Sequence, residues 1–321
     1  MKTILVPLDG TLLAEQALPY VQQLAPVLGA RVLMLRGVTE DEQEQFLASQ
    51  RGQPVDAAIL SPPRVCELCT LTAQCQHTDC YLAAQAERLR TCGVEAYGDS
   101  RIGAPGAVIA ASAAQWPDTL IAMATHAHSG LRRWVRGSVT DTVVHDTTIP
   151  LFLVRGTEPA VAPERTLGRI LVPLDGSAFA SQALPLAIEL AARAQAELTL
   201  LWVVAPSIDE YMRDFPTEAE LRRVLRKQVI RAYASVTSGI PQQPIPLTTV
   251  VTLGSTAETI AEEAGRRRTG LIVMATHGYT GLQRWRLGSV ADALLRLTPT
   301  PLLLVRAQAG EGSATTSVEG L

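Results

Sequence analysis

The chain contains two copies of one sequence pattern, and this repeat constrains its fold more than any other feature. Four short motifs occur twice, with the second occurrence 166 residues after the first for two motifs and 151 residues after it for the others. The repeated motifs are ILVPLDG at 4–10 and 170–176, QALP at 16–19 and 182–185, MATH at 123–126 and 274–277, and GSV at 137–139 and 288–290. Such a repeat indicates two tandem domains, and 321 residues are enough for two domains of ordinary size.

The change in spacing between the motifs indicates an insertion in copy one. Because the offset falls from 166 to 151 residues, copy one carries about fifteen extra residues before its third motif. Four of the five cysteines cluster between Cys66 and Cys80 within that interval, so we expect a cysteine-rich insertion at about 62–82. The expected organisation is a first domain at 1–156, a linker at 157–168, a second domain at 169–308 and a disordered tail at 309–321.

Within each copy, apolar strands alternate with amphipathic helices. In copy two, Ser177 is placed to cap a helix that continues through Ala183 and Leu190. Further helices are expected at 217–235 and from 254 to 265, and strands at 169–174, 197–204, 246–253, 271–274 and 301–305. This alternation predicts an α/β fold in which each copy forms a five-stranded parallel sheet with helices on both faces.

Composition excludes several classes of protein. The net charge is −3, without the basic excess that a nucleic-acid-binding protein needs, so we expect no nucleic-acid partner. No apolar run approaches the ~18 residues of a membrane span, so we expect no membrane partner. The first seven residues are interrupted too soon to form a signal peptide. We therefore expect a cytoplasmic protein.

The aspartates at the end of the first strand of each copy are candidate ligand-binding residues. Asp9 and Asp175 follow that strand directly, and in a doubly wound sheet ligands bind beyond the carboxyl ends of the strands. A carboxylate at this position can accept hydrogen bonds from ribose hydroxyls. Because Asp-Gly is also a common turn pair, the alternative is that each aspartate only fixes the turn.

Small residues after the fourth strand of copy two suit a phosphate group. The strand ends in Ala275-Thr276-His277-Gly278, and nine residues separate Gly278 from Gly288-Ser289. Glycines let backbone N–H groups approach an anion, and a helix that begins at Ser289 directs its positive end toward it. The segment is neither a Walker A loop nor a Gly-x-Gly-x-x-Gly motif.

Together these motifs resemble the universal stress protein family, over about 290 residues in both copies. The resemblance implies Rossmann-like domains of the adenine nucleotide alpha hydrolase type. In the nucleotide-binding branch of that family, the strand-one Asp and a Gly-x2-Gly-x9-Gly-Ser/Thr loop bind ATP. Carried over to copy two, the resemblance implies an ATP site at Pro173, Asp175, Val203, Ala275, Gly278, Gly288, Ser289 and Val290.

Copy one departs further from the family motif, so we expect a weaker site there. Its loop has Ala127 where copy two has Gly278, and alanine costs about 1 kcal/mol or more if this position needs a positive φ or a close approach to phosphate. The remaining site residues are Asp9, Gly137 and Ser138. Gly37 stands where copy two has Val203, which leaves less apolar wall for an adenine ring.

The four clustered cysteines form a second candidate site. Their spacing, Cys66-x2-Cys69-x5-Cys75-x4-Cys80, could hold one tetrahedral metal ion, with zinc favoured and His77 as an alternative ligand. The alternatives are reduced thiols or a redox-active disulfide. The family resemblance neither supports nor opposes this cluster.

The resemblance implies a stress-response regulatory protein that binds ATP mainly in copy two and hydrolyses it slowly at most. Neither a Gly-x-Ser-x-Gly motif nor a His-Glu-x-x-His motif occurs in the sequence, so no catalytic motif of these types indicates an enzyme. The alternative is an interaction or sensor protein that binds no nucleotide and uses its cysteines as a metal or redox element. In the family, the fifth strand pairs across a dimer, so residues 151–154 and 302–305 could form that pair within one chain. A homodimer and an unidentified protein partner are further expectations.

Overall fold

A computed structural model describes most of the chain. The described residues are 1–50, 77–125, 138–156, 167–204, 217–237, 245–277 and 287–307. The expected linker and the expected tail lie largely outside these ranges, as does most of the expected cysteine-rich insertion.

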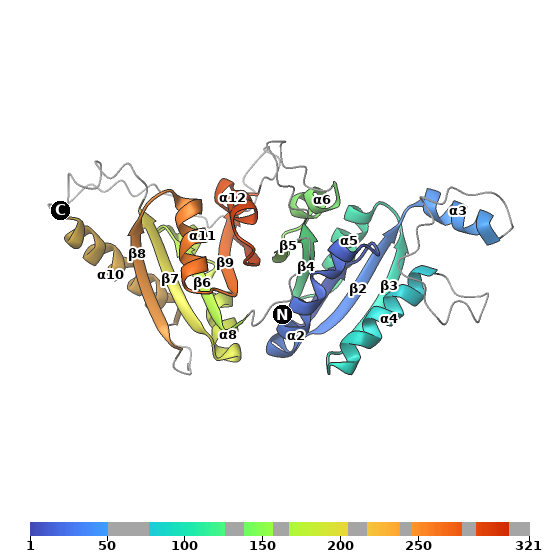
Figure 1. Ribbon diagram of the computed structural model, residues 1–321, viewed down its shortest axis with the longest axis horizontal. Coiled ribbons are helices and arrows are strands. Elements are labelled where there is room, and N and C mark those ends of the chain that lie inside the picture. The colour runs from blue at the N-terminus through green and yellow to red at the C-terminus, as the bar shows by residue number, and fades with distance from the viewer. Residues whose placement is uncertain are drawn as a thin grey trace.

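Each copy forms its own half of the molecule (Figure 1). Domain one contains the strands β1 (Thr3–Pro7), β2 (Arg31–Val38), β3 (Ala96–Ile102), β4 (Thr119–Thr125) and β5 (Leu151–Arg155). Its helices are α1 (Leu12–Glu15), α2 (Leu18–Leu28), α3 (Glu40–Gln50), α4 (His77–Thr91), α5 (Pro105–Ala114) and α6 (Ser138–Asp146).

Domain two repeats this order. Its strands are β6 (Arg169–Leu174), β7 (Glu197–Val204), β8 (Leu247–Leu253), β9 (Leu271–His277) and β10 (Leu302–Ala307). Its helices are α7 (Ala178–Ser181), α8 (Leu184–Ala194), α10 (Glu218–Thr237), α11 (Thr256–Arg266) and α12 (Ser289–Leu297). The predicted strand and helix order of copy two is confirmed.

One prediction about a helix boundary is wrong. Ser177 caps a helix as expected, because its Oγ accepts the N–H of Ala180 at 3.0 Å. That helix, α7, ends after one turn, and a separate helix, α8, begins at Leu184. Pro185 explains the break, because its ring lacks an N–H and would clash with the carbonyl four residues earlier.

The two five-stranded parallel sheets join into one sheet of ten strands, in the order β3-β2-β1-β4-β5-β10-β9-β6-β7-β8. The junction is an antiparallel pair in which Phe152 of β5 lies opposite Leu303 of β10. The prediction that the fifth strands pair within one chain is therefore confirmed.

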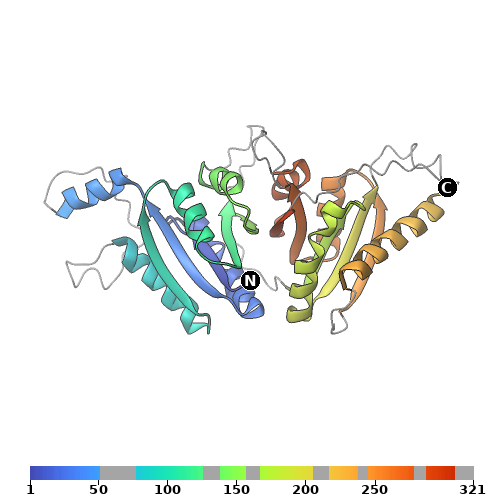
Figure 2. The ribbon, with the colours of Figure 1, turned by 180° about the vertical axis from the view of Figure 1, so that it is seen from behind.

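Helices cover both faces of this sheet, as the two opposite views show (Figures 1 and 2). On one face α2, α4, α8 and α10 pack against the sheet, and on the other face α5, α6, α11 and α12 do so. Successive strand residues enter opposite layers: Ile4 and Val6 join the first and Leu5 joins the second. This double coverage explains why the strands read as continuous apolar runs.

Two arginines hold the domains together beside the strand junction. The Nη2 of Arg306, at the end of β10, donates to the carbonyl of Val144 in α6 at 2.6 Å. The Nη1 of Arg155, at the end of β5, donates to the carbonyl of Arg296 in α12 at 2.8 Å. Each strand therefore supplies a cation to the C-terminal turn of a helix in the other domain, where the helix dipole favours positive charge.

Candidate functional site

The carboxyl ends of the strands provide the crevice where a ligand can bind. In domain one β1 lies between β2 and β4, and in domain two β6 lies between β7 and β9. The chain connections reverse direction at β1 and β6, which places a topological switch point in each domain.

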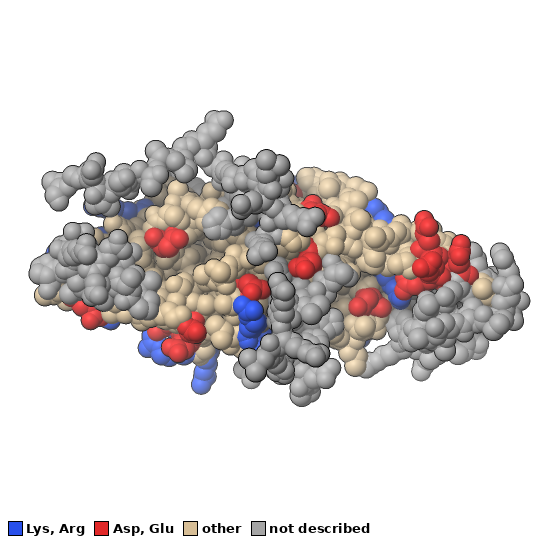
Figure 3. All heavy atoms as spheres, turned by 90° about the horizontal axis from the view of Figure 1, so that it is seen from above, with Lys and Arg blue, Asp and Glu red and all other residues tan. Residues whose placement is uncertain are grey.

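Figure 3 views the molecule from above, and its described surface shows acidic and basic side chains interspersed rather than gathered into one charged field.

A cavity of about 190 Å³ lies at the switch point of domain one. Asp9, one of the predicted site residues of copy one, lines it. The repeat relates four other lining residues to predicted site residues of domain two: Pro7 to Pro173, Gly37 to Val203, Ala124 to Ala275 and Val139 to Val290. Asp9 and the domain-one equivalents of four predicted domain-two residues thus line one cavity.

The two aspartates have the same hydrogen bonds. The Oδ1 of Asp9 accepts the backbone N–H of Thr11 at 2.8 Å and its hydroxyl at 2.6 Å. The Oδ1 of Asp175 accepts the same two groups of Ser177, at 2.9 and 2.6 Å. Fixing the turn is therefore one role of each aspartate. No described residue donates to the Oδ2 atom of either side chain, and both aspartates are solvent-exposed, so each keeps one oxygen for a ligand.

The glycine after each aspartate is required by the fold. Gly10 and Gly176 have φ angles of 89° and 83°, a region that L-residues with a side chain rarely adopt. A Cβ atom at Gly176 would also overlap the ring of Trp202 on β7. Trp202 thus packs directly beneath the turn that carries Asp175, a contact that the sequence analysis did not identify.

Pro105 is a second residue that the sequence analysis missed. A Cβ atom at Gly37 would lie only 2.7 Å from the Cα of Pro105, and both residues line the domain-one cavity. We expected Gly37 to leave less apolar surface for an adenine ring. That expectation is incomplete, because Pro105 occupies the space where a side chain at position 37 would lie. The repeat could have drawn attention to this residue. Pro105 follows Gly103 by two residues, as Thr256 follows Gly254, so the two residues occupy equivalent positions in the two copies.

In domain two, Ser289 begins α12 as predicted, and Gly288 is its N-cap residue. Gly288 has φ −52° and ψ 146°, a conformation open to any residue, and it supplies no side-chain cap. Among the described residues, no atom lies within 4 Å of a Cβ added at this position. The fold itself therefore does not demand glycine here, and the first N–H groups of α12 remain available to an anion.

Thr276 adds a polar group at the end of β9. Its residue exposure is 2%, and its Oγ1 atom has no hydrogen-bond partner within the described part of the chain. The equivalent Thr125 in domain one directs its hydroxyl to the carbonyl of Val154 at 3.5 Å. A buried hydroxyl without a partner is costly, so this atom marks a place where a further group would be stabilising.

Comparison with known proteins identifies the family. A model of the universal stress protein family matches residues 1–155 and again residues 166–306. The chain belongs to the universal stress protein family. Its two domains are therefore two universal stress protein domains in tandem.

Individual relatives agree with this assignment. The universal stress protein YxiE of Bacillus subtilis is 27% identical over 150 residues, which are 43% of this chain and 98% of the relative. A universal stress protein of Methanocaldococcus jannaschii is 30% identical over 146 residues, 44% of this chain and 84% of the relative. A solved universal stress protein structure from Archaeoglobus fulgidus has the same fold, with a TM-score of 0.65 at 20% identity over 95% of this chain and 98% of that one.

The remaining predicted nucleotide-site residues of this universal stress protein are only partly described. Pro173, Val203 and Val290 are half-buried on β6, β7 and α12, and Ala275 lies near the end of β9. Gly278 and Gly137 lie outside the described residues, and for Ser138 only its place at the start of α6 is described.

The predicted metal site also lies mostly outside the described residues. This is true of Cys66, Cys69 and Cys75, and of the His77 side chain. Cys80, on α4, is disulfide-bonded, so its sulfur is not a thiolate ligand in this structure. Across the described ranges, no three His, Cys, Asp or Glu side chains are placed to hold one metal ion. Zinc binding therefore stays a prediction.

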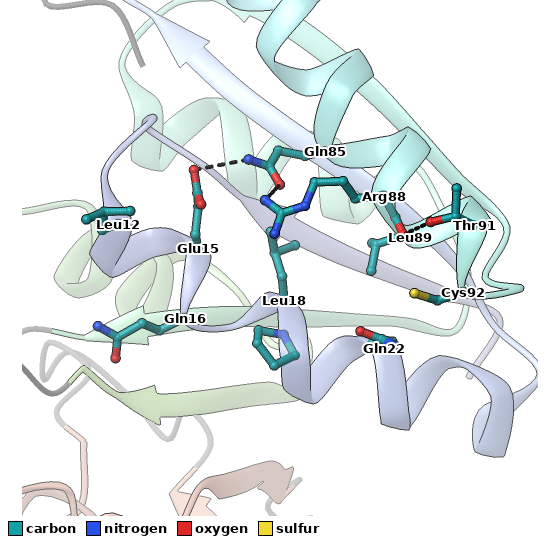
Figure 4. Close-up of a pocket in the computed structure, with 11 residues that line it drawn as sticks. Leu12, Glu15, Gln16, Leu18, Gln22, Gln85, Arg88, Leu89, Thr91 and Cys92 are labelled. Atoms are coloured by element: carbon teal, nitrogen blue, oxygen red, sulfur yellow. Dashed lines mark hydrogen bonds between the residues drawn. The ribbon is translucent and has the colours of Figure 1, made fainter. Parts of the chain in front are cut away.

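A second hollow, of about 490 Å³, lies between α1, α2 and α4 (Figure 4). The Oε1 of Glu15 accepts hydrogen bonds from Tyr81 Oη at 3.0 Å and from Gln85 Nε2 at 3.1 Å. Arg88 donates to Gln85 Oε1 at 3.1 Å, which completes a chain of polar contacts along one wall. Burial and the neighbouring Glu15 raise the pKa of Tyr81, which keeps its hydroxyl a donor. This network ties α1 to α4.

No helix in the described ranges has both the length and the apolar character needed to cross a bilayer.

Proposed function

We propose that this universal stress protein is a regulatory protein that binds ATP mainly in domain two. The observation that carries the proposal is Gly288, the N-cap residue of α12, whose backbone conformation and surroundings do not require glycine. Space without a side chain at an uncapped helix start suits a phosphate group. The Oδ2 atom of Asp175 suits a ribose hydroxyl at the neighbouring strand end.

Sequence differences favour domain two over domain one. Domain two has Gly278 where domain one has Ala127, which leaves the backbone more freedom at the phosphate loop. Domain two also offers the Val203 side chain at the adenine wall, whereas in domain one the backbone of Pro105 packs against Gly37. Domain one retains a cavity with Asp9, and we propose that it binds nucleotide more weakly.

The chemistry of the cavity suits binding better than catalysis. Asp9 is the one ionisable side chain among the described residues that line the domain-one cavity, and its Oδ1 is committed to the turn. General acid–base chemistry needs a positioned group with a proton to accept or deliver. Slow hydrolysis at most fits this lining, and bound ATP would act by shifting the population of partner-competent states.

Calorimetric titration of the full chain with ATP tests the proposal. Gly288→Leu places a side chain where the phosphates would lie and should abolish binding in domain two. Gly265→Leu is the matched control, since a Cβ at this exposed α11 glycine also meets no described atom within 4 Å. Gly265→Leu should bind as wild type does. Unchanged affinity in Gly288→Leu would overturn the proposed site.

A second candidate function is a redox-responsive interaction protein that needs no nucleotide. The disulfide bond at Cys80 favours it, because this bond lies on α4, the helix that is tied to α1 through Tyr81 and Glu15. Intact-mass measurement after alkylation, with and without reductant, should show the disulfide as a loss of two alkylatable thiols. Full alkylation of all five cysteines without reductant would contradict this candidate.

A further inference from the structure

The ten-stranded sheet ends at two outer strands, β3 in domain one and β8 in domain two (Figure 1). The inner edges, β5 and β10, pair with each other, so in the described structure only β3 and β8 carry a row of backbone groups without a neighbouring strand. Such rows can pair with another chain, and proteins often protect them with charges or proline.

The β3 edge carries that protection. It contains both Asp99 and Arg101, whose side chains form an ion pair of 2.9 Å, and Gly98 lies beside them. Ser100 is engaged with Asp79 of α4 through a hydrogen bond of 2.6 Å. A strand that approached β3 would have to desolvate these charges, which opposes pairing.

Strand β8 carries no such protection between Pro246, which precedes it, and Gly254, which follows it. Its seven residues, Leu247–Leu253, read LTTVVTL and contain only leucine, threonine and valine. These residues favour strands, and no charge, glycine or proline interrupts them. The two edges of one sheet therefore differ sharply in what they allow to approach.

We propose that β8 is a docking edge for β8 of a second copy, aligned antiparallel about a twofold axis at Val250. The sequence is nearly the same when read backwards, so this register brings like residues together except where Thr249 lies opposite Val251. Leu247 lies opposite Leu253 of the partner, Thr248 opposite Thr252 and Val250 opposite Val250. Thr–Thr and aliphatic pairs stabilise antiparallel strands, and a twofold contact closes after two copies.

Strand β8 itself offers exposed apolar surface to this contact. Leu247, its first residue, is 38% exposed. The contact would also continue a sheet that already contains one antiparallel junction of short apolar strands, that between β5 and β10. Pairing at β8 would thus join two ten-stranded sheets edge to edge.

Charge on α10 opposes the contact and makes it salt-dependent. The helix carries five basic residues against two acidic ones, and the α10 helices of the two copies would approach each other with their strands. Salt screens such repulsion at distances beyond about 10 Å at 0.1 M. With one short strand pair and this repulsion, we expect a weak dimer that higher salt strengthens.

Sedimentation of the full chain at increasing concentration tests the proposal. The mass should rise from 34.4 kDa toward twice that value, and the transition should shift to lower concentration in higher salt. Val250→Lys places two ammonium groups opposite each other, and Thr249→Lys places two on a diagonal. Each should raise the dissociation constant roughly tenfold or more. Val250→Thr keeps a strand-forming neutral residue and should retain the dimer.

Controls separate the proposed edge from other contacts. Tyr97→Lys on β3 should leave the dimer unchanged. Circular dichroism checks that each variant is folded, and hydrogen exchange should show concentration-dependent protection confined to β8. A monomer at every concentration, a dimer that survives both lysine variants at β8, or a ladder of higher oligomers from β8–β3 contacts would each overturn the proposal.

Discussion

Asp175 has two roles that substitutions can separate, because its two carboxylate oxygens have different partners. Oδ1 holds the N–H and hydroxyl of Ser177, whereas Oδ2 faces no described donor. Asp175→Asn can keep the turn through its remaining carbonyl oxygen, so we expect its stability to stay within about 0.5 kcal/mol of wild type. Asp175→Ala should lose about 1 kcal/mol, because the cap of α7 loses its anchor.

Both variants should weaken ATP binding under the proposed function, because both remove the charged acceptor. Urea denaturation measures the stabilities and calorimetry measures the affinities. Wild-type affinity in Asp175→Ala would show that the aspartate fixes only the turn.

Two glycines of domain two should respond oppositely to alanine. At Gly176 the φ angle of 83° and the ring of Trp202 both exclude a Cβ, so Gly176→Ala should destabilise by at least about 2 kcal/mol. Gly265 lies within α11 with open space around it, so Gly265→Ala should stabilise by about 0.5–1 kcal/mol. Chemical denaturation of both variants checks the prediction, and a shift of the same sign in both would contradict it.

At the scale of elements, the C-terminal turn of α11 makes stability depend on pH. Burial alone would raise the pKa of Glu263, but hydrogen bonds from Arg266 and Arg267 outweigh it and hold the pKa below its ordinary value of 4.5. A carboxylate with a lowered folded-state pKa stabilises the protein fully above pH 4.5, and this contribution disappears as pH falls through the lowered value.

Glu263→Gln removes this contribution. Wild type should be more stable than the variant at pH 6, and the difference should shrink steadily as pH falls below 4.5. Urea denaturation midpoints of both proteins, measured from pH 6 to below pH 4.5, test this prediction. A difference that stays constant with pH would show that Glu263 acts through packing rather than charge.

The arginines that link the domains should differ in importance. Arg306 is 9% exposed and its hydrogen bond to Val144 is buried, so Arg306→Ala leaves a buried carbonyl unpaired and should cost about 1–3 kcal/mol. The bond from Arg155 to Arg296 is exposed, and water can replace it, so Arg155→Ala should cost less. Equal losses in thermal or urea denaturation would contradict this order.

At the scale of the whole molecule, the sequence predicted most of the architecture because the fold is repeated. Each strand of copy two is an apolar run in the sequence, and the repeated motifs indicate the same fold for copy one. The antiparallel junction could also be expected, from the family resemblance and the short apolar strands 151–154 and 302–305.

What the sequence did not predict depends on contacts between distant segments. The packing of Pro105 against Gly37 and of Trp202 beneath Gly176 joins residues from different elements, which local patterns cannot reveal. The arginine links between domains likewise require the three-dimensional junction. The break between α7 and α8 was readable from Pro185, but the helical spacing of the apolar residues concealed it.

Counting the nucleotides bound to each chain tests the central claim most directly. Native mass spectra of the full chain at a low ATP concentration, where only the tighter site fills, should show one bound nucleotide. Gly288→Leu should remove this nucleotide, whereas Gly265→Leu should retain it. Wild type without bound nucleotide even at saturating ATP, or a nucleotide that persists in Gly288→Leu at the low ATP concentration, would contradict an ATP site in domain two.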